Sequence, residues 1–465
     1  MIFKSKYYSI VHTDQPCAYD DEVRSLSARI IPCHSPSDPG RQPHLAFIVT
    51  AAMSTWFFRG QIRRLREAGF RVSFISNPWP QTQGAYVEGA EIITLPIERE
   101  IAPFRDLISL WRLWRILRRI RPDIINVGTP KAGLLGGIAA RLAFIPRRVY
   151  TLHGLRFETA SGWKHGLLKL MECISCHNVQ YVRCVSPSLY QRAIQLGVLD
   201  REKAYVIGAG SANGIDCEHY QVTPERILRA QELRQSLGIP ASAPVIGFVG
   251  RFTRDKGFTE LYGAYISLRQ SWPELHLLLV GDFEDGDPVD AAIRERLQSD
   301  ANVHFTGMVA DVAPYYHVMR LLAFPTYREG LGQVSLEAQA SGVPVVTTTA
   351  TGARDSVLDG ITGKLVPPRD EAALAVALHE LLADPEKRQR MGNAGPGWVK
   401  QQFQRELIWD AVLEDYRKIL REEHGHSLSL SRAIKSVFGR TAAFHAARNG
   451  HLRESDRPTQ SKPGR

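Results

Sequence analysis

Short apolar runs alternate with amphipathic stretches along most of the chain. The first run, HLAFIVT from His44, is continuous and apolar, as in strands that are buried on both faces. It is followed by FFRGQIRRLREAG, in which apolar residues recur at helical spacing, and then by a second apolar run, FRVSFIS. Strands and helices that alternate at this pace predict a parallel, doubly wound α/β sheet.

The alternation runs twice through the sequence. The first series ends near YVRCVSPS, after which the glycines and the Asn-Gly pair of YVIGAGSANGID interrupt the pattern. The second series begins with the apolar run PVIGFVG and ends with PVVTTT and GKLVPP, and long helices are predicted from Glu371 to about Arg421. We therefore predict two similar-sized Rossmann-like domains in tandem, residues 43–215 and 216–425, with a hinge near Asp216 to Pro244.

The two ends of the chain differ from this pattern. Residues 1–42 are polar and rich in Pro and Ser towards their end, which predicts a flexible or loosely docked extension. Residues 426–465 form a basic tail, with eight Lys and Arg residues against Glu454 and Asp456. The net charge of +10 leaves nucleic acid, anionic lipid and diphosphate substrates open as partners. No recognisable reader motif is present, so we expect no nucleic-acid partner.

The sequence also predicts where in the cell the protein is located. MIFKSKYYSIVHTDQP lacks an apolar h-region, and the longest apolar candidate for a span, AGLLGGIAARLAFIP, is broken by Arg141. We expect a cytosolic protein whose six cysteines are reduced. CISCH, from Cys173 to His177, has the spacing of a c-type haem attachment site. Because that chemistry needs export, we interpret the segment as thiols on a helix.

Candidate chemistry is expected after the strands, because ligands of open parallel sheets bind at the carboxyl ends of the strands. Gly250 and Arg251 follow the run VIGFVG, and Lys256 comes five residues later, near a predicted helix start. Two cations beside free backbone N–H groups favour an anion site, with a diphosphate as the obvious guest. The alternative is that both are solvated surface bases.

Two glutamates flank the glycines of YREGLGQVSLE. Glu329 is predicted in a loop, and Glu337 about one turn inside a helix that begins near Gln333. Gly330 and Gly332 would let the backbone approach a ligand closely. The carboxylates should therefore not touch each other, but grip two parts of one elongated ligand, with the amides of residues 331–334 between them. Taken alone, the stretch would be read as a loop charge and a solvated helix residue.

Four further positions follow strands. His153, beside Gly154, is a better site candidate than most lone histidines, and the main chain at Gly307 could approach a flat base. Ser54 and Thr55 could donate to a phosphate. The acids near Asp282, namely Glu284, Asp285 and Asp287, could bind a metal, but helix capping and solvation are favoured, so no metal site is predicted.

Together these residues resemble the retaining glycosyltransferases of family 4, which have the two-domain GT-B fold. The E-x7-E pattern is Glu329 to Glu337, the GRxxxxKG pattern begins at Gly250, and VYTLHG supplies His153. The segments TPKAGLLGGIAARLAFIPRRVYTLHGLRFE, GSANGID and VGDFEDGDP are similar to a branch common in bacterial exopolysaccharide, capsule and lipopolysaccharide O-antigen assembly. The resemblance covers roughly residues 43–420.

The resemblance implies a metal-independent hexosyltransferase without a cofactor, whose donor is a nucleotide-diphosphate sugar, with a UDP-sugar favoured. Glu329 would hold sugar hydroxyls, Glu337 the ribose, and Arg251 and Lys256 the diphosphate in place of a metal. His153 would contact the sugar or assist at the reaction centre. The catalytic residues would be His153, Glu329, Arg251 and Lys256. The donor-binding residues would be Ser54, Thr55, Gly250, Arg251, Lys256, Asp282, Gly307, Met308, Glu329, Gly330, Leu331, Gly332, Gln333, Val334 and Glu337.

The resemblance further implies a polyprenyl-diphosphate-linked saccharide acceptor at the inner face of the membrane. FRDLISLWRLWRILRRIRP carries Trp111 and Trp114 with Arg112, Arg115, Arg118, Arg119 and Arg121, which suits an anionic membrane surface and favours peripheral binding. The alternative is a helix that packs one face on the sheet and turns arginines outward. Asn126 and Gly128 stand where relatives often carry histidines, and EGLGQV replaces the commoner EGFPNV, which bears on the choice of sugar and acceptor.

Two other functional classes remain at this point. One is a nucleotide-sugar epimerase or a sucrose-synthase-like soluble transferase of the same fold, which product analysis would separate from the first reading. The other is a non-catalytic subunit that binds nucleotide sugars or partner transferases. The presence of Glu329, Glu337, Arg251, Lys256 and His153 argues against the second class.

Overall fold

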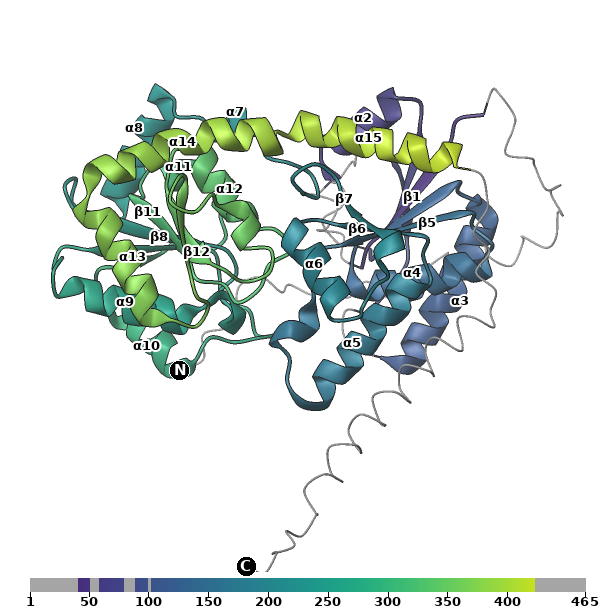
Figure 1. Ribbon diagram of the computed structural model, residues 1–465, viewed down its shortest axis with the longest axis horizontal. Helices are drawn as coiled ribbons and strands as arrows, with labels where there is room; N and C mark the ends of the chain where they lie inside the picture. Colours follow the sequence, from purple (N-terminus) through teal and green to yellow (C-terminus); the bar gives the residue numbers. More distant parts are fainter. Residues whose placement is uncertain (1–40, 51–57, 79–87, 99–101, 423–465) are drawn as a thin grey trace, which may run out of the picture. The chain divides into compact units, whose positions relative to one another are not determined.

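The computed structural model describes residues 41–50, 58–78, 88–98 and 102–422 (Figure 1). From Pro43 on, the described residues belong to one compact unit that contains two parallel sheets. Both predicted doubly wound domains are confirmed. Ser54 and Thr55, the extension before residue 41 and the tail after residue 422 lie outside the described residues.

The first sheet has seven parallel strands in the order β3-β2-β1-β4-β5-β6-β7. β1 is buried along its whole length, as its continuous apolar run predicts. In chain order the strands are β1 His44–Ile48, β2 Arg71–Ser76, β3 Glu91–Thr94, β4 Ile124–Val127, β5 Arg147–Leu152, β6 Tyr181–Cys184 and β7 Ala204–Val206. The main helices are α2 Gln61–Glu67, α3 Pro103–Ile120, α4 Pro130–Leu142, α5 Gly162–His177 and α6 Pro187–Gln195.

The second sheet has six parallel strands in the order β10-β9-β8-β11-β12-β13. They are β8 Val245–Val249, β9 His276–Val280, β10 Val303–Phe305, β11 Leu321–Phe324, β12 Val345–Thr348 and β13 Gly363–Val366. The helices around them are α7 Cys217–Tyr220, α8 Pro224–Ser236, α9 Phe258–Arg269, α10 Ala291–Ser299, α11 Ala313–Tyr316, α12 Gln333–Ala340, α13 Glu371–Ala383 and α14 Pro385–Phe403. Each sheet has a hydrophobic core of its own.

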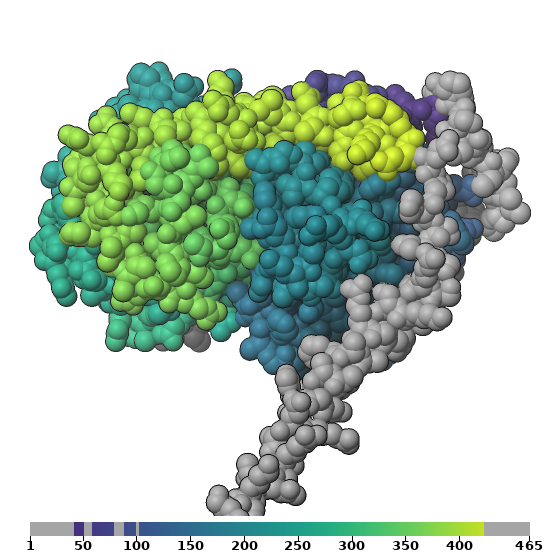
Figure 2. Space-filling model, in the orientation of Figure 1, coloured from purple at the N-terminus to yellow at the C-terminus, as the bar shows by residue number. Residues whose placement is uncertain are grey.

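The last helix, α15 Arg405–Arg421, returns to the first sheet (Figure 1). Its apolar residues Ile408, Val412 and Tyr416 are buried in one cluster with Phe47 of β1. Figure 2 shows its yellow residues packed on the purple and blue ones of the first domain. The predicted boundary places residues 216–425 in one domain, whereas the structure gives this helix to the other core. The physical reason is its apolar stripe, which is buried in a cluster with residues of α2 and of the first sheet.

Two crossings of the chain between the domains run side by side. The backbone N–H of Ile215 donates to the oxygen of Phe403 at 2.7 Å, and that of Arg405 donates to Ile215 at 3.0 Å. Arg405 also forms an ion pair with Asp216. The predicted hinge begins at this crossing, but most of it is taken up by α7 and α8. Hinge motion itself stays a prediction.

Two smaller features can be compared with the predictions from the sequence. The stretch YVIGAGSANGID, read as an interruption, contains most of β7, which pairs with β6. The cysteines of CISCH lie on α5 as free thiols, with Cys176 buried, as interpreted from the sequence. Among the helices of the described residues, none is long and apolar enough to cross a bilayer.

Candidate active site

The loop after β8 is held against the end of β11 by a glycine. Gly257 has φ +75° between a short 3-10 turn, Arg254–Lys256, and the start of α9. A Cβ atom at Gly257 would overlap the carbonyl oxygen of Pro325, so any other residue would push the two loops apart. This contact fixes where Lys256 leaves the backbone.

Lys256 forms an ion pair with Glu329 from the loop after β11. The two side chains are 10% and 15% exposed. The hydroxyl of Thr326 donates to the same carboxylate at 2.9 Å, and the backbone N–H of Glu329 donates to Thr351 at 2.8 Å. The sequence predicted separate ligand contacts for these two residues. The structure brings them into direct contact, in a largely buried place where an ion pair is stronger than at the surface.

Arg251 lies further out, with 54% of its side chain exposed, and forms an ion pair with Glu284. The other acids of that loop serve the same turn, since Asp287 pairs with Arg254 and accepts from the backbone N–H of Asp255 at 3.2 Å. The acidic loop after β9 was interpreted from the sequence as helix-capping and solvated residues. In the structure it forms ion pairs with the basic loop after β8. In the described part of the chain, no group of three His, Cys, Asp or Glu side chains is placed to hold a metal ion.

Glu337 lies in α12, which begins at Gln333 as predicted. Its carboxylate accepts a hydrogen bond at 2.9 Å from the hydroxyl of Tyr316, and a second from Tyr220. Burial raises the pKa of Glu337 to about 7, with these hydrogen bonds opposing the shift. It is therefore not a solvated helix residue. Sequence reasoning missed both tyrosines, because nothing local marks partners that stand so far from Glu337 in the chain.

Two of the four amides proposed for phosphate binding have acceptors inside the protein. The N–H of Gly332 donates to Gly352 at 3.4 Å, and that of Gln333 donates to Leu331 at 2.7 Å. The carbonyl oxygen of Val334 accepts from Tyr316 at 3.3 Å. A ligand that binds the amides of Gly332 and Gln333 would therefore have to displace these two hydrogen bonds.

His153 follows β5 and meets the glycine loop of the second domain. A Cβ atom at Gly330 would overlap the carbonyl oxygen of His153, and Gly154, with φ +139°, lies opposite Gly330. Burial lowers the pKa of His153 to about 4, and the charge of Arg183 adds to the shift. The imidazole is therefore neutral at physiological pH. It stands beside Gly128, where a Cβ atom would lie 3.6 Å from its Nε2.

Further hydrogen bonds join the two strand-end surfaces. The hydroxyl of Ser188 accepts from the N–H of Gly352 at 2.7 Å, and the N–H of Ser188 donates to Asp355 at 3.0 Å. Arg328 donates to the hydroxyl of Thr159 at 2.9 Å and pairs with Asp255, next to Lys256. These contacts connect the Lys256 loop to the first domain, and no local sequence pattern predicts them.

The remaining predicted donor-binding residues of the second domain also follow the carboxyl ends of its strands. The N–H of Gly281 donates to the oxygen of Gly307 at 3.1 Å, which joins the ends of β9 and β10. Met308 is 72% exposed beside this bridge. Asp282 accepts from the N–H of Phe283 at 2.8 Å, so its carboxylate is engaged in its own turn.

Comparison with known proteins identifies the family. The model described as Glycosyltransferase Family 4 matches residues 57–219, and the one described as Glycosyl transferases group 1 matches residues 243–384. The capsular polysaccharide biosynthesis glycosyltransferase CapM of Staphylococcus aureus is 35% identical over 378 residues, which cover 81% of this chain and 98% of CapM. The chain belongs to the family 4 glycosyltransferases.

Two more relatives are similar to this glycosyltransferase. The lipopolysaccharide core biosynthesis glycosyltransferase LpsE of Rhizobium meliloti is 28% identical, over 77% of this chain and 94% of LpsE. The structure of HepE of Anabaena in complex with UDP-glucose superposes with a TM-score of 0.67 at 23% identity, over 81% of this chain and 99% of HepE. This likeness shows the fold, and the GT-B prediction is confirmed.

The family motifs thus fall at one edge of the second sheet and at one strand end of the first. Asn126, where relatives often carry histidine, has a structural role. Its amide donates to the hydroxyl of Tyr416 at 2.6 Å, and its oxygen accepts from Thr151 at 2.9 Å. Asn126 therefore contributes to the docking of α15 on the first sheet.

Proposed function

We propose that this family 4 glycosyltransferase moves a hexose from a nucleotide-diphosphate sugar to a saccharide acceptor, with retention of the anomeric configuration. The observation that carries the proposal is the largely buried ion pair of Lys256 and Glu329, from the loops after β8 and β11, which are also followed by Arg251 and by Glu337 of α12. A sugar nucleotide presents hydroxyls, a diphosphate and a ribose in that order. Two cations and two carboxylates provide groups for all three parts: Glu329 for the sugar hydroxyls, Lys256 and Arg251 for the diphosphate, and Glu337 for the ribose.

The charges at the site fit departure of a nucleoside diphosphate. Negative charge grows on the leaving phosphate in the transition state, and a cation that is already held in place stabilises it without rearrangement. Lys256 is held in this way by Glu329 and by the loop around Gly257. Arg251, on the exposed side, would exchange Glu284 for the diphosphate. This supports a reaction in which protein cations take the part of a divalent metal.

The neutral His153 would contact the donor sugar or assist at the reaction centre. An imidazole whose pKa is lowered to about 4 does not compete with Lys256 as a cation, but it can donate or accept a hydrogen bond. Its carbonyl oxygen packs on Gly330, which would place the sugar beside the glycine loop. The main chain at Gly307 and Met308 would face the nucleotide base.

The relatives support the biological setting. CapM is named for capsular polysaccharide and LpsE for the lipopolysaccharide core, and HepE was crystallised with UDP-glucose. We propose that the donor is a UDP-sugar and that the acceptor is a polyprenyl-diphosphate-linked saccharide. The product would be a surface polysaccharide, assembled by the chain as a cytoplasmic protein peripheral to the inner face of the membrane.

The test is incubation of the purified full chain with a panel of sugar nucleotides and a membrane lipid extract. Release of nucleoside diphosphate and a labelled lipid-linked product are expected with one donor, and the product anomer, read by NMR, should match that of the donor. Activity should survive excess EDTA. A labelled sugar nucleotide that returns with its sugar inverted at one carbon, and no lipid product, would instead identify an epimerase. Full activity of Lys256→Ala would overturn the assigned site.

A further inference from the structure

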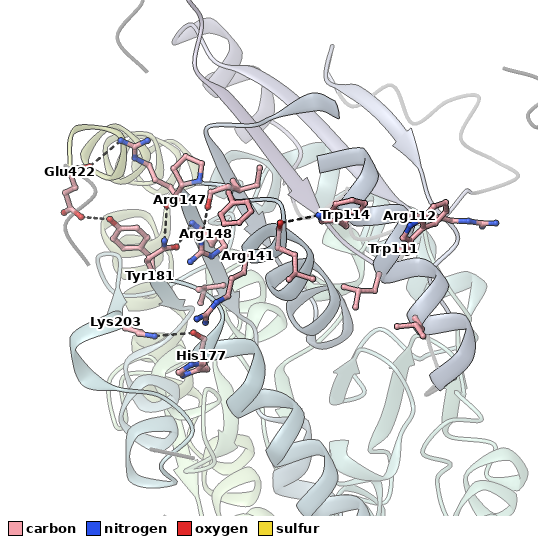
Figure 3. Close-up of a pocket in the computed structure, with 18 of the residues that line it drawn as sticks. Trp111, Arg112, Trp114, Arg141, Arg147, Arg148, His177, Tyr181, Lys203 and Glu422 are labelled. Atoms are coloured by element: carbon pink, nitrogen blue, oxygen red, sulfur yellow. Dashed lines mark hydrogen bonds between the residues drawn. The ribbon is translucent and has the colours of Figure 1, made fainter. Parts of the chain in front are cut away.

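A large hollow opens in the first domain at the amino ends of the strands. The active site lies at their carboxyl ends. The hollow has a volume of about 1670 Å³, and it lies among α3, the end of α4 and the first residues of β5 and β6 (Figure 3). Arg147 begins β5, whereas His153 follows the last residue of the same strand. The hollow and the active site are therefore at opposite ends of β5.

One wall of the hollow is apolar and open to solvent. Four of its residues, Leu107, Ile108, Trp111 and Leu142, are at least half exposed. The three from α3 lie on two successive turns, beside Leu110 and Trp114, which also line the hollow. A contiguous apolar surface of this kind on a protein marks a place where another apolar surface docks.

The backbone conformation of Phe144, which also lines the hollow, is further evidence for a docking surface. Phe144 follows α4 in the left-handed region, with φ +57°, a conformation that favours glycine. The N–H of Phe144 donates to Arg141 and that of Ile145 donates to Ala140, which is the hydrogen-bond pattern of a Schellman turn. The ring is 82% exposed, so packing inside the described protein does not offset the cost of this turn. The exposed ring is therefore placed where an external partner can reach it.

The other wall is basic. Arg141, Arg148, Lys203 and His177 lie together on one side in Figure 3, and the two tryptophans lie on the other. Arg148 donates to the carbonyl oxygens of Asn178 and Ile145, and Lys203 to that of His177. Burial lowers the pKa values of Arg148 and Lys203, and the neighbouring charge of Arg141 lowers both further, while Asp200 opposes the shift of Lys203. Two acids, Glu202 and Glu422, line the rim, and Glu422 accepts from Tyr181 at 2.6 Å.

We propose that this hollow binds an anionic phospholipid of the bilayer. The lipid phosphate would be held by Arg141, Arg148 and Lys203, and an acyl chain would lie along α3 and the ring of Phe144. The inference deepens the peripheral membrane location in the proposed function and rests on it. It adds a defined lipid site, at the end of the sheet opposite to the reaction.

Charge and shape favour a lipid over the other occupants. A soluble phosphate compound would use the cations but leave the apolar wall and Phe144 without a role. An apolar peptide would use that wall but leave a cluster of cations facing it. The segment 423–465 carries a large excess of Lys and Arg, so it would repel the basic wall. Arg115 and Arg118, stacked on Trp111 and Trp114 at 4.8 and 5.8 Å, suit the same anionic surface.

The test is flotation of the full chain with vesicles of phosphatidylglycerol and phosphatidylcholine, compared with vesicles of phosphatidylcholine alone. The chain should bind the anionic vesicles roughly 10-fold or more tightly. Phe144→Gly keeps the turn and removes the ring, so it should fold at least as stably and bind roughly 10-fold more weakly. Arg141→Gln with Lys203→Gln should lose a similar factor. Leu228→Ala and Arg296→Gln, exposed positions in the second domain, are the matched controls.

A second arm separates a lipid from a free phosphate. Short-chain phosphatidylglycerol below its micelle concentration should bind one molecule per chain in native mass spectrometry, and inorganic phosphate should not displace it. Equal binding to both kinds of vesicle, unchanged binding by the Phe144 and double variants, or full displacement by phosphate would each overturn the inference. Donor turnover in detergent is measured for every variant. The proposed function fails if the wild-type chain lacks turnover, whatever the vesicle result.

Discussion

Lys256 and Glu329 form an ion pair between two loops that leave neighbouring strands, β8 and β11, at their carboxyl ends. Both side chains are largely buried, and Thr326 donates a further hydrogen bond to the carboxylate. Removal of either partner leaves the other charge buried and unpaired, which costs more than the pair itself contributes. The two residues should therefore act as one unit towards the donor.

We expect Lys256→Ala to lower kcat/KM for nucleoside diphosphate release by about 100- to 1000-fold, because in the proposed function Lys256 is the cation that would stabilise the leaving phosphate. Glu329→Ala should also reduce transfer, since it removes the ion-pair partner of Lys256 and the carboxylate that is proposed to hold the sugar hydroxyls. The double variant should be little worse than the more damaging single one. Lys364→Ala, which breaks the pair with Glu380 on the second domain, is the control and should keep full activity. Strictly additive effects of the two changes would contradict the coupling.

Glu337→Ala should chiefly weaken donor binding and leave turnover at saturating donor closer to wild type. The pKa of Glu337 is raised to about 7, so the residue ionises within the physiological range. The ionised carboxylate is the stronger acceptor for ribose hydroxyls, and we expect affinity for UDP to rise by roughly 10-fold as the pH increases from 6 to 8. Calorimetric titration of UDP at several pH values measures this rise. Glu337→Gln, the control for ionisation of the nucleotide itself, should show a smaller slope.

The parts of the fold that follow from local patterns could be predicted. Buried parallel strands appear in the sequence as continuous apolar runs, and the predicted start of α12 at Gln333 is confirmed. α15 could not be assigned in this way. Its apolar stripe shows that it packs on something, but only the tertiary structure shows that Tyr416 meets Asn126 rather than the second core.

The candidate site, like the fold, could be predicted only in part from the sequence. Residues that follow strands and carry charge, such as Lys256 and Glu329, could be placed at one edge of a sheet from the sequence. Their pairing could not, because hydrogen-bond partners depend on loop conformations that glycines such as Gly257 determine. Tyr316 and Tyr220 around Glu337 were missed for a related reason. They come from separate elements, and no spacing rule connects side chains that meet only after folding.

Gly330→Ala tests the contact between the two domains. Its added Cβ would overlap the carbonyl oxygen of His153, so the first domain would have to move away from the glycine loop. Because a small displacement of catalytic groups lowers rates steeply, we expect roughly 10- to 100-fold loss of kcat/KM with each domain still folded. Gly397→Ala, whose Cβ meets no atom within 4 Å, is the matched control and should retain activity. Equal activity of both variants would show that this contact is not needed.

Glu172 should make stability depend on pH. Burial raises its pKa to about 7, while Tyr150 donates a hydrogen bond to it at 2.6 Å. The ordinary glutamate pKa is 4.5, so between pH 4.5 and 7 the unfolded chain binds fewer protons than the folded one. The free energy of unfolding should therefore fall as the pH rises through this window, by up to about 3 kcal/mol. Glu172→Gln should be more stable than wild type at pH 8 but not at pH 4.5, as measured by urea denaturation. The exposed Glu274→Gln should leave the wild-type pH dependence unchanged.

Tyr416→Phe tests what holds α15 on the first domain. The Tyr416 hydroxyl accepts a buried hydrogen bond from Asn126 at 2.6 Å, and Arg183 stacks on the ring at 4.8 Å while pairing with Asp415. Loss of the hydroxyl leaves the Asn126 amide without this acceptor, so we expect the free energy of unfolding to fall by about 1–3 kcal/mol. Tyr181→Phe is the matched control, because its hydroxyl donates at the surface to Glu422 and should cost less than ~1 kcal/mol. Thermal and urea denaturation of both variants give the comparison. Equal small losses would mean that the apolar residues Ile408 and Val412 hold the helix by themselves, and that Asn126 has no part in its docking.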